Sequence, residues 1–323
     1  MLMLFSLSNT VNAQIDPHFS QYYAYPLWLN PALTGVFDGE ARMTGNFRDQ
    51  WNGSNSGYRT RAISGDIRYS EKMALGVNII NQAAGSVGYN YLGGYGTLAY
   101  QVRVSTDGYH KLNFGLQAGV INRSFDVNKL QMDNQYNSTT GYDPSMPNFE
   151  NFNTTGATIF DASAGVFYYD GNPSGRLNLF GGVSVAHLAT GKDAISMDGL
   201  SARVPMRFTV HSGIRIKAGD FLDITPHVIY IQQQKAKEQA LGLNFEVNVK
   251  SDYSLMIGGM YRKDDAFIGN VNLYMKNLIV GVSYDYTSSA LKQSSNFRGG
   301  YEVSVSYVFK RKLARMDENC PRL

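Results

Sequence analysis

Residues 301–310 read Tyr-Glu-Val-Ser-Val-Ser-Tyr-Val-Phe-Lys, with large apolar side chains at the odd positions and Glu302, Ser304 and Ser306 between them. Successive side chains of a β-strand point to opposite faces, so this stretch would present one apolar and one polar face. Residues 204–217 and 241–250 alternate in the same way. A tilted strand needs about 9–11 residues to cross a hydrocarbon core, whereas soluble strands average nearer five or six. The pattern therefore indicates membrane-spanning strands.

The same template, applied along the whole chain, predicts fourteen strands, which is an even number. They lie near 40–51, 59–70, 73–82, 90–104, 110–123, 159–169, 176–188, 204–217, 221–232, 238–249, 252–262, 265–275, 278–287 and 299–310. The predicted fold is an all-β transmembrane barrel of about fourteen antiparallel strands. A soluble β-sandwich is the alternative that the alternation alone leaves open.

Connection lengths favour the barrel over the sandwich. Short turns such as 70–72 and 218–220 follow even-numbered strands. The long connections follow odd-numbered strands: 124–158, 189–203 and 288–298. Short periplasmic turns on one rim and long external loops on the other are typical of outer-membrane barrels. Two odd connections, 83–89 and 263–264, are short, so the pattern is imperfect.

Composition excludes several other classes of protein. The chain has 323 residues, of which 43% are hydrophobic and only 17% charged. No stretch approaches the roughly 20 apolar residues of a membrane helix, which excludes a polytopic helical protein. A single Cys excludes a disulfide framework and any CxxC metal site. The net charge of +3 is too small to suggest nucleic-acid binding.

The cost of placing charge against lipid assigns the two faces of each strand. An Arg or Lys facing lipid at mid-membrane costs roughly 2–4 kcal/mol, so the apolar positions should face outward. The charged side chains expected in the lumen are Arg42, Arg48, Arg68, Arg103, Arg123, Arg207, Arg215 and Glu246. Aromatic residues near strand ends suit interface girdles: Tyr69, Tyr168, Tyr261, Tyr286, Tyr301 and Phe309. The luminal arginines could form an anion-selective pore, or pair with Asp66, Asp161 and Glu246 in a plugged barrel, which we favour.

Four regions are expected along the chain. Residues 1–13 resemble a signal peptide whose start is truncated, ending at the small-residue pattern Val11-x-Ala13. Residues 14–39 form an N-terminal segment, 40–310 the barrel, and 311–323 a periplasmic tail, which either docks elsewhere or is a disordered stub. The N-terminal segment is aromatic and contains three prolines, so it can be neither a regular helix nor a central strand. We expect it at or in the periplasmic mouth, packed there or bound to a partner.

The N-terminal segment also carries a family resemblance. It reads Asp16-Pro17-x-Phe19-Ser20-Gln21-Tyr22, then Pro26-Leu27-x-x-Asn30-Pro31-Ala32-x-x-Gly35, then Arg48-Asp49-Gln50-Trp51. This is similar to the opening of the PorP/SprF family, outer-membrane proteins of the type IX secretion and gliding motility machinery of Bacteroidetes. The ending Cys320-Pro321-Arg322 is also similar. One departure is Phe47-Arg48, where members often have Tyr-Arg.

The resemblance implies a protein-transport role and a set of partners. It implies contact with other type IX components in the periplasm and outer membrane, and service to a secreted surface protein such as an adhesin. The residues expected to bind a partner are Asp16, Phe19, Gln21, Trp28, Asn30, Pro31, Gly35, Trp51 and Cys320. Cys320 could pair with a partner's thiol or remain unmodified. The alternative function is a general diffusion porin or small-solute channel.

No catalytic, cofactor or metal motif accompanies these features. The five histidines have no HxxxH or HxH spacing, so we expect no zinc or iron site and no enzyme activity. In residues 124–158, Asp126, Asp133 and Asp143 could supply oxygen ligands to calcium, but their spacing fits no EF-hand. A solvated external loop, or one folded into the lumen, is the simpler interpretation. As the longest loop, it is also the best candidate to contact a secreted partner.

Overall fold

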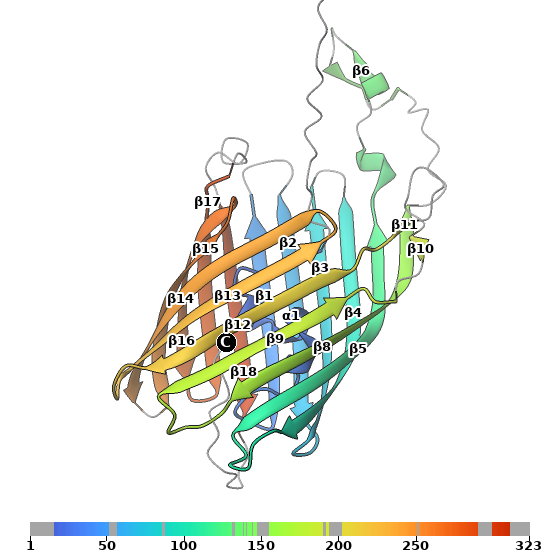
Figure 1. Cartoon of the computed structure of the whole chain (residues 1–323). Coiled ribbons are helices and arrows are strands. Elements are labelled where there is room, and N and C mark those ends of the chain that lie inside the picture. The colour runs from blue at the N-terminus through green and yellow to red at the C-terminus, as the bar shows by residue number, and fades with distance from the viewer. Residues whose placement is uncertain are drawn as a thin grey trace, which may run out of the picture.

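The strands of the computed structural model close into a single antiparallel barrel (Figure 1). The residues that the structure describes are 16–51, 57–85, 88–130, 133–137, 139, 141–143, 145–146, 155–189, 192–193, 202–250, 252–289 and 299–310. The order around the barrel is β1-β18-β17-β16-β15-β14-β13-β12-β9-β8-β5-β4-β3-β2, so each barrel strand pairs with its sequence neighbours. Closure comes from β1 and β18, which pair from Ala41↔Phe309 to Gln50↔Gly300. The prediction of a fourteen-stranded barrel is confirmed.

Every predicted strand is present, with ends within three residues of those expected. The barrel strands are β1 (Ala41–Gln50), β2 (Tyr58–Arg68), β3 (Met73–Ala84), β4 (Tyr89–Arg103), β5 (His110–Ser124), β8 (Gly156–Asp170), β9 (Leu177–Ala186), β12 (Arg207–Lys217), β13 (Leu222–Gln233), β14 (Ala236–Lys250), β15 (Tyr253–Arg262), β16 (Ala266–Met275), β17 (Leu278–Thr287) and β18 (Gly300–Phe309). Short elements in the long loops are η3 (Val127–Lys129), η4 (Asp133–Gln135), β6 (Tyr136–Asn137) with β7 (Gly141–Tyr142), and β10 (Lys192–Asp193) with β11 (Ala202–Arg203).

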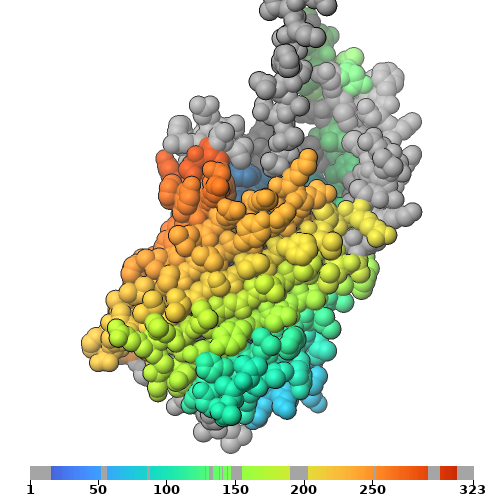
Figure 2. Space-filling view, in the orientation of Figure 1, coloured from blue at the N-terminus to red at the C-terminus, as the bar shows by residue number. Residues whose placement is uncertain are grey.

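The two rims differ as the connection lengths indicated. One rim, which we call the turn rim, has only short connections, such as those between β14 and β15 or β16 and β17. The opposite rim, the loop rim, carries the connections after β5, β9 and β17, and β6, which belongs to the first of them, lies at the top of Figure 1. The loop rim also has short connections. Besides the two that the sequence indicated, a third short connection, Gln234 to Lys235, joins β13 to β14. The wall between the rims is a continuous surface of steeply tilted rows of side chains on the side seen in Figure 2.

Side chains divide between the two faces of the wall as the cost of charge in lipid requires. In β14, Leu241, Leu243 and Phe245 are exposed on the outside, while Asn244 and Glu246 are buried in the lumen. The eight expected luminal charges all have inward parity, although Arg103 lies at the turn rim with half its side chain exposed. The outward face is not free of charge, however: Arg59 and Arg61 of β2 lie on it near the loop rim.

The N-terminal segment lies inside the barrel. Residues 16–39, which we call the plug segment, contain η1 (Tyr22–Ala24), α1 (Pro26–Leu29) and η2 (Pro31–Leu33). Their apolar side chains join those of the inner wall in two buried clusters, one around Leu33 and Phe167 and the other around Trp28 and Tyr95. No helix within the described residues is both long enough and apolar enough to span a membrane.

Candidate functional site

The plug segment runs through the lumen in short helical turns set by its prolines. Pro26 and Pro31 occupy the first positions of α1 and η2, where a missing N–H is harmless and the fixed φ suits a helix. Asn30 separates the two turns in an extended conformation, and its Oδ1 accepts from the N–H of Ala32 at 2.9 Å. Short helical turns that begin at the two prolines are thus separated by an extended residue, within the lumen of the barrel.

One end of the plug segment is held near the loop rim by a cluster that we call the aspartate anchor: Asp16, His187, Asp161 and Arg207. His187, just after β9, donates from Nε2 to Asp16 at 2.7 Å and from Nδ1 to Asp161 at 2.9 Å. Arg207, the first residue of β12, donates to the same Asp16 oxygen at 2.9 Å. The side chains of Asp16, Asp161 and His187 are almost completely buried. The anchor therefore joins the segment to β8, the end of β9 and β12 through buried charge.

The charges of the aspartate anchor set one another's protonation. Burial opposes protonation of His187, but the carboxylates of Asp16 and Asp161 outweigh it and raise its pKa to about 9. Burial likewise opposes ionisation of Asp16, but His187 and Arg207 overcome it and lower its pKa well below the usual range. His187 is therefore an imidazolium at neutral pH, held between two carboxylates.

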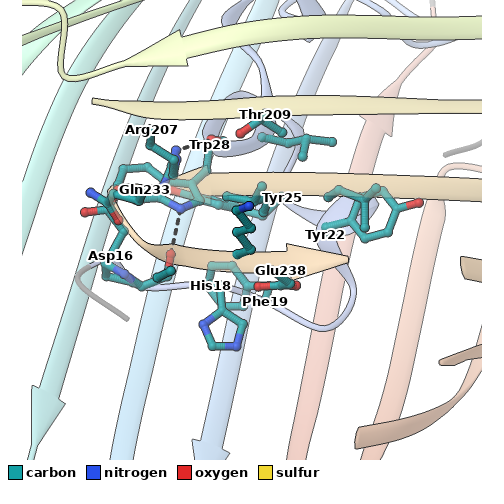
Figure 3. Close-up of a pocket in the computed structure, with 16 residues that line it drawn as sticks. Asp16, His18, Phe19, Tyr22, Tyr25, Trp28, Arg207, Thr209, Gln233 and Glu238 are labelled. Carbon is teal, nitrogen blue, oxygen red and sulfur yellow. Dashed lines mark hydrogen bonds and ion pairs between the residues drawn. The ribbon is translucent and has the colours of Figure 1, made fainter. Parts of the chain in front are cut away.

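Trp28 connects this anchor to the aromatic part of the plug segment (Figure 3). The guanidinium of Arg207 lies 4.6 Å from the Trp28 ring centroid, and Arg207 also donates to the Trp28 carbonyl at 3.0 Å. The Trp28 Nε1 donates to the carbonyl of Pro17 at 2.9 Å. Beside these groups lies a cavity of about 80 Å³ between the segment and β12–β14, lined by Tyr22, Tyr25, Ile229 and Glu238 among others.

A second cluster, the arginine anchor, holds the following residues: Ser20, Arg48, Arg262, Asp285 and Glu302. Asp285 of β17 accepts from Arg48 at 2.8 Å, from Arg262 at 3.1 Å and from the Ser20 hydroxyl at 2.6 Å. Glu302 of β18 accepts from the backbone N–H of Ser20 at 2.7 Å. Two arginines and two carboxylates from four strands thus surround one turn of the plug segment. The opposite charges neutralise one another within the lumen, as expected for a plugged barrel in which luminal arginines pair with carboxylates.

Of the three carboxylates expected to pair with luminal arginines, Asp66 does so. Arg42 pairs with Asp66 at 2.8 Å. Asp161 contacts His187 and the Tyr95 hydroxyl, and Glu246 accepts from Ser254 at 2.6 Å among its contacts. Alternation could place these carboxylates in the lumen, but it could not say which strands face each other across it.

Asn30 and Pro31 fit a slot that glycines open in the wall. Asn30 Nδ2 donates to the carbonyls of Val166 and Val183, which are opposite each other on β8 and β9, at 3.1 and 3.3 Å. A methyl group on Gly165 would overlap Asn30 Oδ1, and one on Gly182 would lie 2.7 Å from Asn30 Nδ2. One on Gly115 of β5 would collide with the Pro31 backbone. Only a bare backbone lets the segment approach this closely.

The far end of the plug segment reaches the turn rim. The N–H of Gly35, whose φ is +78°, donates to Asp66 near the end of β2 at 2.8 Å. Beside it a cavity of about 180 Å³ opens between the segment and the wall. Its lining includes Arg42, Lys250, Asp252, Lys276 and Lys310. The segment therefore extends from the turn rim almost to the loop rim, farther into the lumen than a position at the periplasmic mouth.

The residues expected to bind a partner lie mainly in contacts with the chain's own wall. Those buried inside the lumen are Asp16, Phe19, Gln21, Trp28, Asn30, Pro31 and Gly35. Trp51 lies apart from them at the loop rim, where its ring meets Tyr58 edge-on at 5.6 Å. Cys320 and the expected signal peptide and tail lie outside the described residues.

Sequence reasoning missed four wall residues that hold the segment. They are His187, Arg262, Asp285 and Glu302. Arg262, Asp285 and Glu302 lie at inward-facing positions of strands that the alternation predicted, so their place in that alternation could have identified them as luminal. His187 follows the end of β9 with a φ of 61°, which no strand pattern predicts.

The longest loop offers no assembled ion site in its described part. Asp126 lies 3.8 Å from Lys129, and Asp143 accepts from the Ser145 N–H at 2.9 Å, so both carboxylates bond within the loop. Across the described ranges, no group of three or more His, Cys, Asp or Glu side chains is arranged to hold a metal ion.

These features define a class of protein: an outer-membrane β-barrel whose lumen is filled by its own N-terminal segment. The sequence model of one protein family, described as type IX secretion system membrane protein PorP/SprF, matches residues 11–307, which is nearly the whole chain. The chain belongs to this family. It is accordingly an outer-membrane component of type IX secretion. The members of this family are secretion components rather than enzymes.

Solved structures support the fold at low sequence identity. The toluene transporter TbuX of Ralstonia pickettii is 11% identical, with a TM-score of 0.53 over 88% of this chain and 94% of that one. The toluene transporter TodX of Pseudomonas putida is 11% identical, with a TM-score of 0.52 over 87% and 92%. No curated protein matches the chain.

Proposed function

We propose that this protein helps type IX secretion to export or surface-anchor one cargo protein, such as an adhesin, without serving as its conduit. The observation that carries the proposal is the plug segment, which is tied to the wall by two buried charge clusters. Breaking a buried ion pair by removing one partner typically costs about 3–5 kcal/mol. A cargo crossing the lumen would have to break several such contacts together. The rims are the surfaces left for partners.

The loop rim suits the secreted partner. It carries the long connections, including the one after β5, and loops commonly hold binding residues on a rigid scaffold. The plug residues that resemble the family signature would then act indirectly. By fixing the segment against the wall, they would hold the rims in one conformation for a partner.

The turn rim suits a periplasmic secretion component. Lys250, Lys276 and Lys310 surround the larger cavity there, with Asp252 as a nearby carboxylate. Tyrosine and asparagine side chains line the same cavity, so it offers stacking and hydrogen bonding as well as positive charge. An acidic segment of a partner would complement this rim.

A deletion strain tests the proposal. Loss of the gene should abolish surface display of the cargo while outer-membrane permeability to small solutes stays unchanged. Complementation with the intact gene is the control. Normal display in the deletion strain would rule out the proposed role. A pull-down from detergent-solubilised membranes should recover other type IX components and identify the cargo.

A small-solute channel is the second candidate. It is favoured by the two cavities beside the plug segment, one toward each rim, and by the fold shared with proteins described as toluene transporters. Single-channel recording in planar bilayers separates the two functions. A closed lumen predicts little or no conductance for the intact protein and a large one after removal of residues 16–39. A large, steady conductance of the intact protein would favour the channel.

A further inference from the structure

A band of polar side chains crosses the outside of the barrel just below the loop rim. Its members, which we call the loop-side band, are Arg59 and Arg61 of β2, Asn81 of β3, Asn90 of β4, Asn122 of β5 and Thr158 of β8. All have outward parity. Each lies within four residues of the end of its strand at the loop rim. The band therefore occupies adjacent strands at similar distances from that rim.

The opposite wall has a different composition at the same rim. There the outward residues next to the strand ends are Tyr261, Phe267, Tyr286 and Tyr301, all at least two-fifths exposed. Aromatic side chains of this kind form the usual interface girdle of outer-membrane barrels. On β2, β3, β4, β5 and β8 the corresponding outward positions carry arginine, asparagine and threonine, with Ala83 and Leu92 between them. This wall is thus built for a different environment at the same depth.

The two arginines carry the charge of the band. Arg61 is exposed and lies opposite Phe47 on β1 and Asn81 on β3. Within the described ranges, no carboxylate lies at ion-pair distance from Arg61. Arg59 has half its side chain exposed, and among the described residues its ion-pair contact is with Asp49 at 3.5 Å. An arginine on a lipid-facing wall needs an anion or headgroup water, and lipid phosphate is the anion present at that depth.

The asparagines add hydrogen-bonding groups beside this charge. Asn81 Nδ2 donates to Asn90 Oδ1 at 2.7 Å and to the Tyr91 carbonyl at 3.1 Å, which fixes the Asn81 amide and leaves the Asn90 amide nitrogen outside this bond. Asn122 donates to the Thr158 hydroxyl at 2.8 Å. Amide groups suit sugar hydroxyls, and a guanidinium suits phosphate because its fork binds two oxygens at once.

From this arrangement we propose that the loop-side band binds a phosphorylated glycolipid of the outer leaflet. Arg59 and Arg61 bind its phosphate, and Asn81 and Asn90 bind hydroxyls of its sugar. The site lies on the lipid-facing wall, so its ligand is a membrane component in contact with the outside of the barrel. The inference is independent of the proposed role in cargo export.

Thermal unfolding of the intact protein in nanodiscs tests the proposal. The discs contain phosphatidylcholine alone, or phosphatidylcholine with a minor fraction of diphosphoryl lipid A. Lipid A should raise the unfolding midpoint of the wild type by several degrees. R59Q/R61Q should lose most of this shift, and R59K/R61K should keep part of it, because lysine binds phosphate only as a point charge. K237Q is the matched control: Lys237 is exposed near the loop rim on β14, outside the band.

Three results would overturn the proposal. The first is an equal lipid A shift in the wild type and in R59Q/R61Q. The second is an equal shift from dephosphorylated lipid A, which can be measured on the wild type alone if the double variant does not assemble. The third is an equal shift from inorganic phosphate added to phosphatidylcholine discs, since the site would then recognise the free anion. A surface that holds a partner protein predicts no lipid A dependence at all.

Discussion

Asn30 shows how a single polar residue fixes the position of the plug segment. It is fully buried, and it uses both ends of its amide: Oδ1 caps η2, while Nδ2 bridges carbonyls of β8 and β9. A buried amide left without partners would cost about 1–3 kcal/mol. Gly165 and Gly182 make these contacts possible by removing the side chains that would fill the same space.

Alanine at Gly165 should displace Asn30. The added methyl group would overlap Asn30 Oδ1, and overpacking of this kind typically costs about 1–3 kcal/mol. We expect a lower thermal unfolding midpoint and faster proteolysis within residues 16–39. G269A is the control, because a methyl group on Gly269 of β16 meets no atom within 4 Å. Equal behaviour of G165A and G269A would show that the glycine slot does not position the segment.

The aspartate anchor should respond to pH. The pKa of His187 is about 9 in the folded protein, against 6.5 for a free histidine. Its stabilising contribution is therefore complete below about pH 6.5 and is lost as the pH rises through 9. Asp16, whose pKa is lowered, contributes above about pH 4 and loses its contribution in acid.

H187Q isolates this contribution. Proteolysis of the wild-type plug segment should accelerate between pH 7 and pH 10, as the imidazolium loses its proton. H187Q should be cleaved faster than the wild type at pH 7 and should change little over the same range. A wild-type cleavage rate that does not vary with pH would mean that His187 charge does not hold the segment.

At the scale of elements, the plug segment depends on the wall for its structure. Isolated helices shorter than roughly 12–15 residues are marginal in water, and α1 has four residues. Its stability comes from the aspartate and arginine anchors at one end, the glycine slot in the middle and the Gly35–Asp66 bond at the other. Weakening one anchor should therefore loosen only part of the segment.

D285N should disturb the arginine anchor most. It removes the charge shared by Arg48 and Arg262, whose side chains are 1% and 3% exposed. A buried pair broken in this way costs about 3–5 kcal/mol. E71Q is the control: the Glu71–Arg103 pair is more than half exposed, and such pairs contribute about 0–1 kcal/mol. Unfolding in urea compares the two, and a similar loss in both would argue against a structural role for the anchor.

Substitutions in the signature itself test whether the segment serves a partner. W28A, N30A or P31A should weaken barrel assembly or the recovery of type IX components in a pull-down. Trp28 would lose its contact with Arg207, and Asn30 its bonds to β8 and β9. If all three variants assemble normally and recover the same components, the segment is only a leader to β1.

At the scale of the whole molecule, closure of the sheet lets the barrel sit in lipid. Every strand of the barrel has two neighbours, so the wall leaves no unpaired edge, as the hydrocarbon core requires. L243R places a charge at the middle of β14 on the outward face and should cost roughly 2–4 kcal/mol. Folding into vesicles from urea measures this cost, and L243F, which keeps the position apolar, should fold normally. Equal folding of both would mean that this face does not meet lipid.

The sequence by itself determined the strands, their inward and outward faces, the two rims and the family. Alternation has a period of two residues and is a local property, so no knowledge of the fold is needed to read it. Residues 301–310 illustrate this, since they form β18 with the expected faces. The predicted ends of the strands differ from the observed ends by a few residues, because loop geometry determines where each strand ends.

The tertiary structure decided which polar groups meet and how deep the plug segment lies. Asp16 and His187 are 171 residues apart, and Arg48 and Asp285 are 237 apart. Closure brings such residues together across the lumen, and no local pattern encodes which strands face one another there. Alternation placed arginines and carboxylates inside the barrel. Only the closed sheet, with glycines 115, 165 and 182 opening one side of it, determined that they surround a segment of the chain itself.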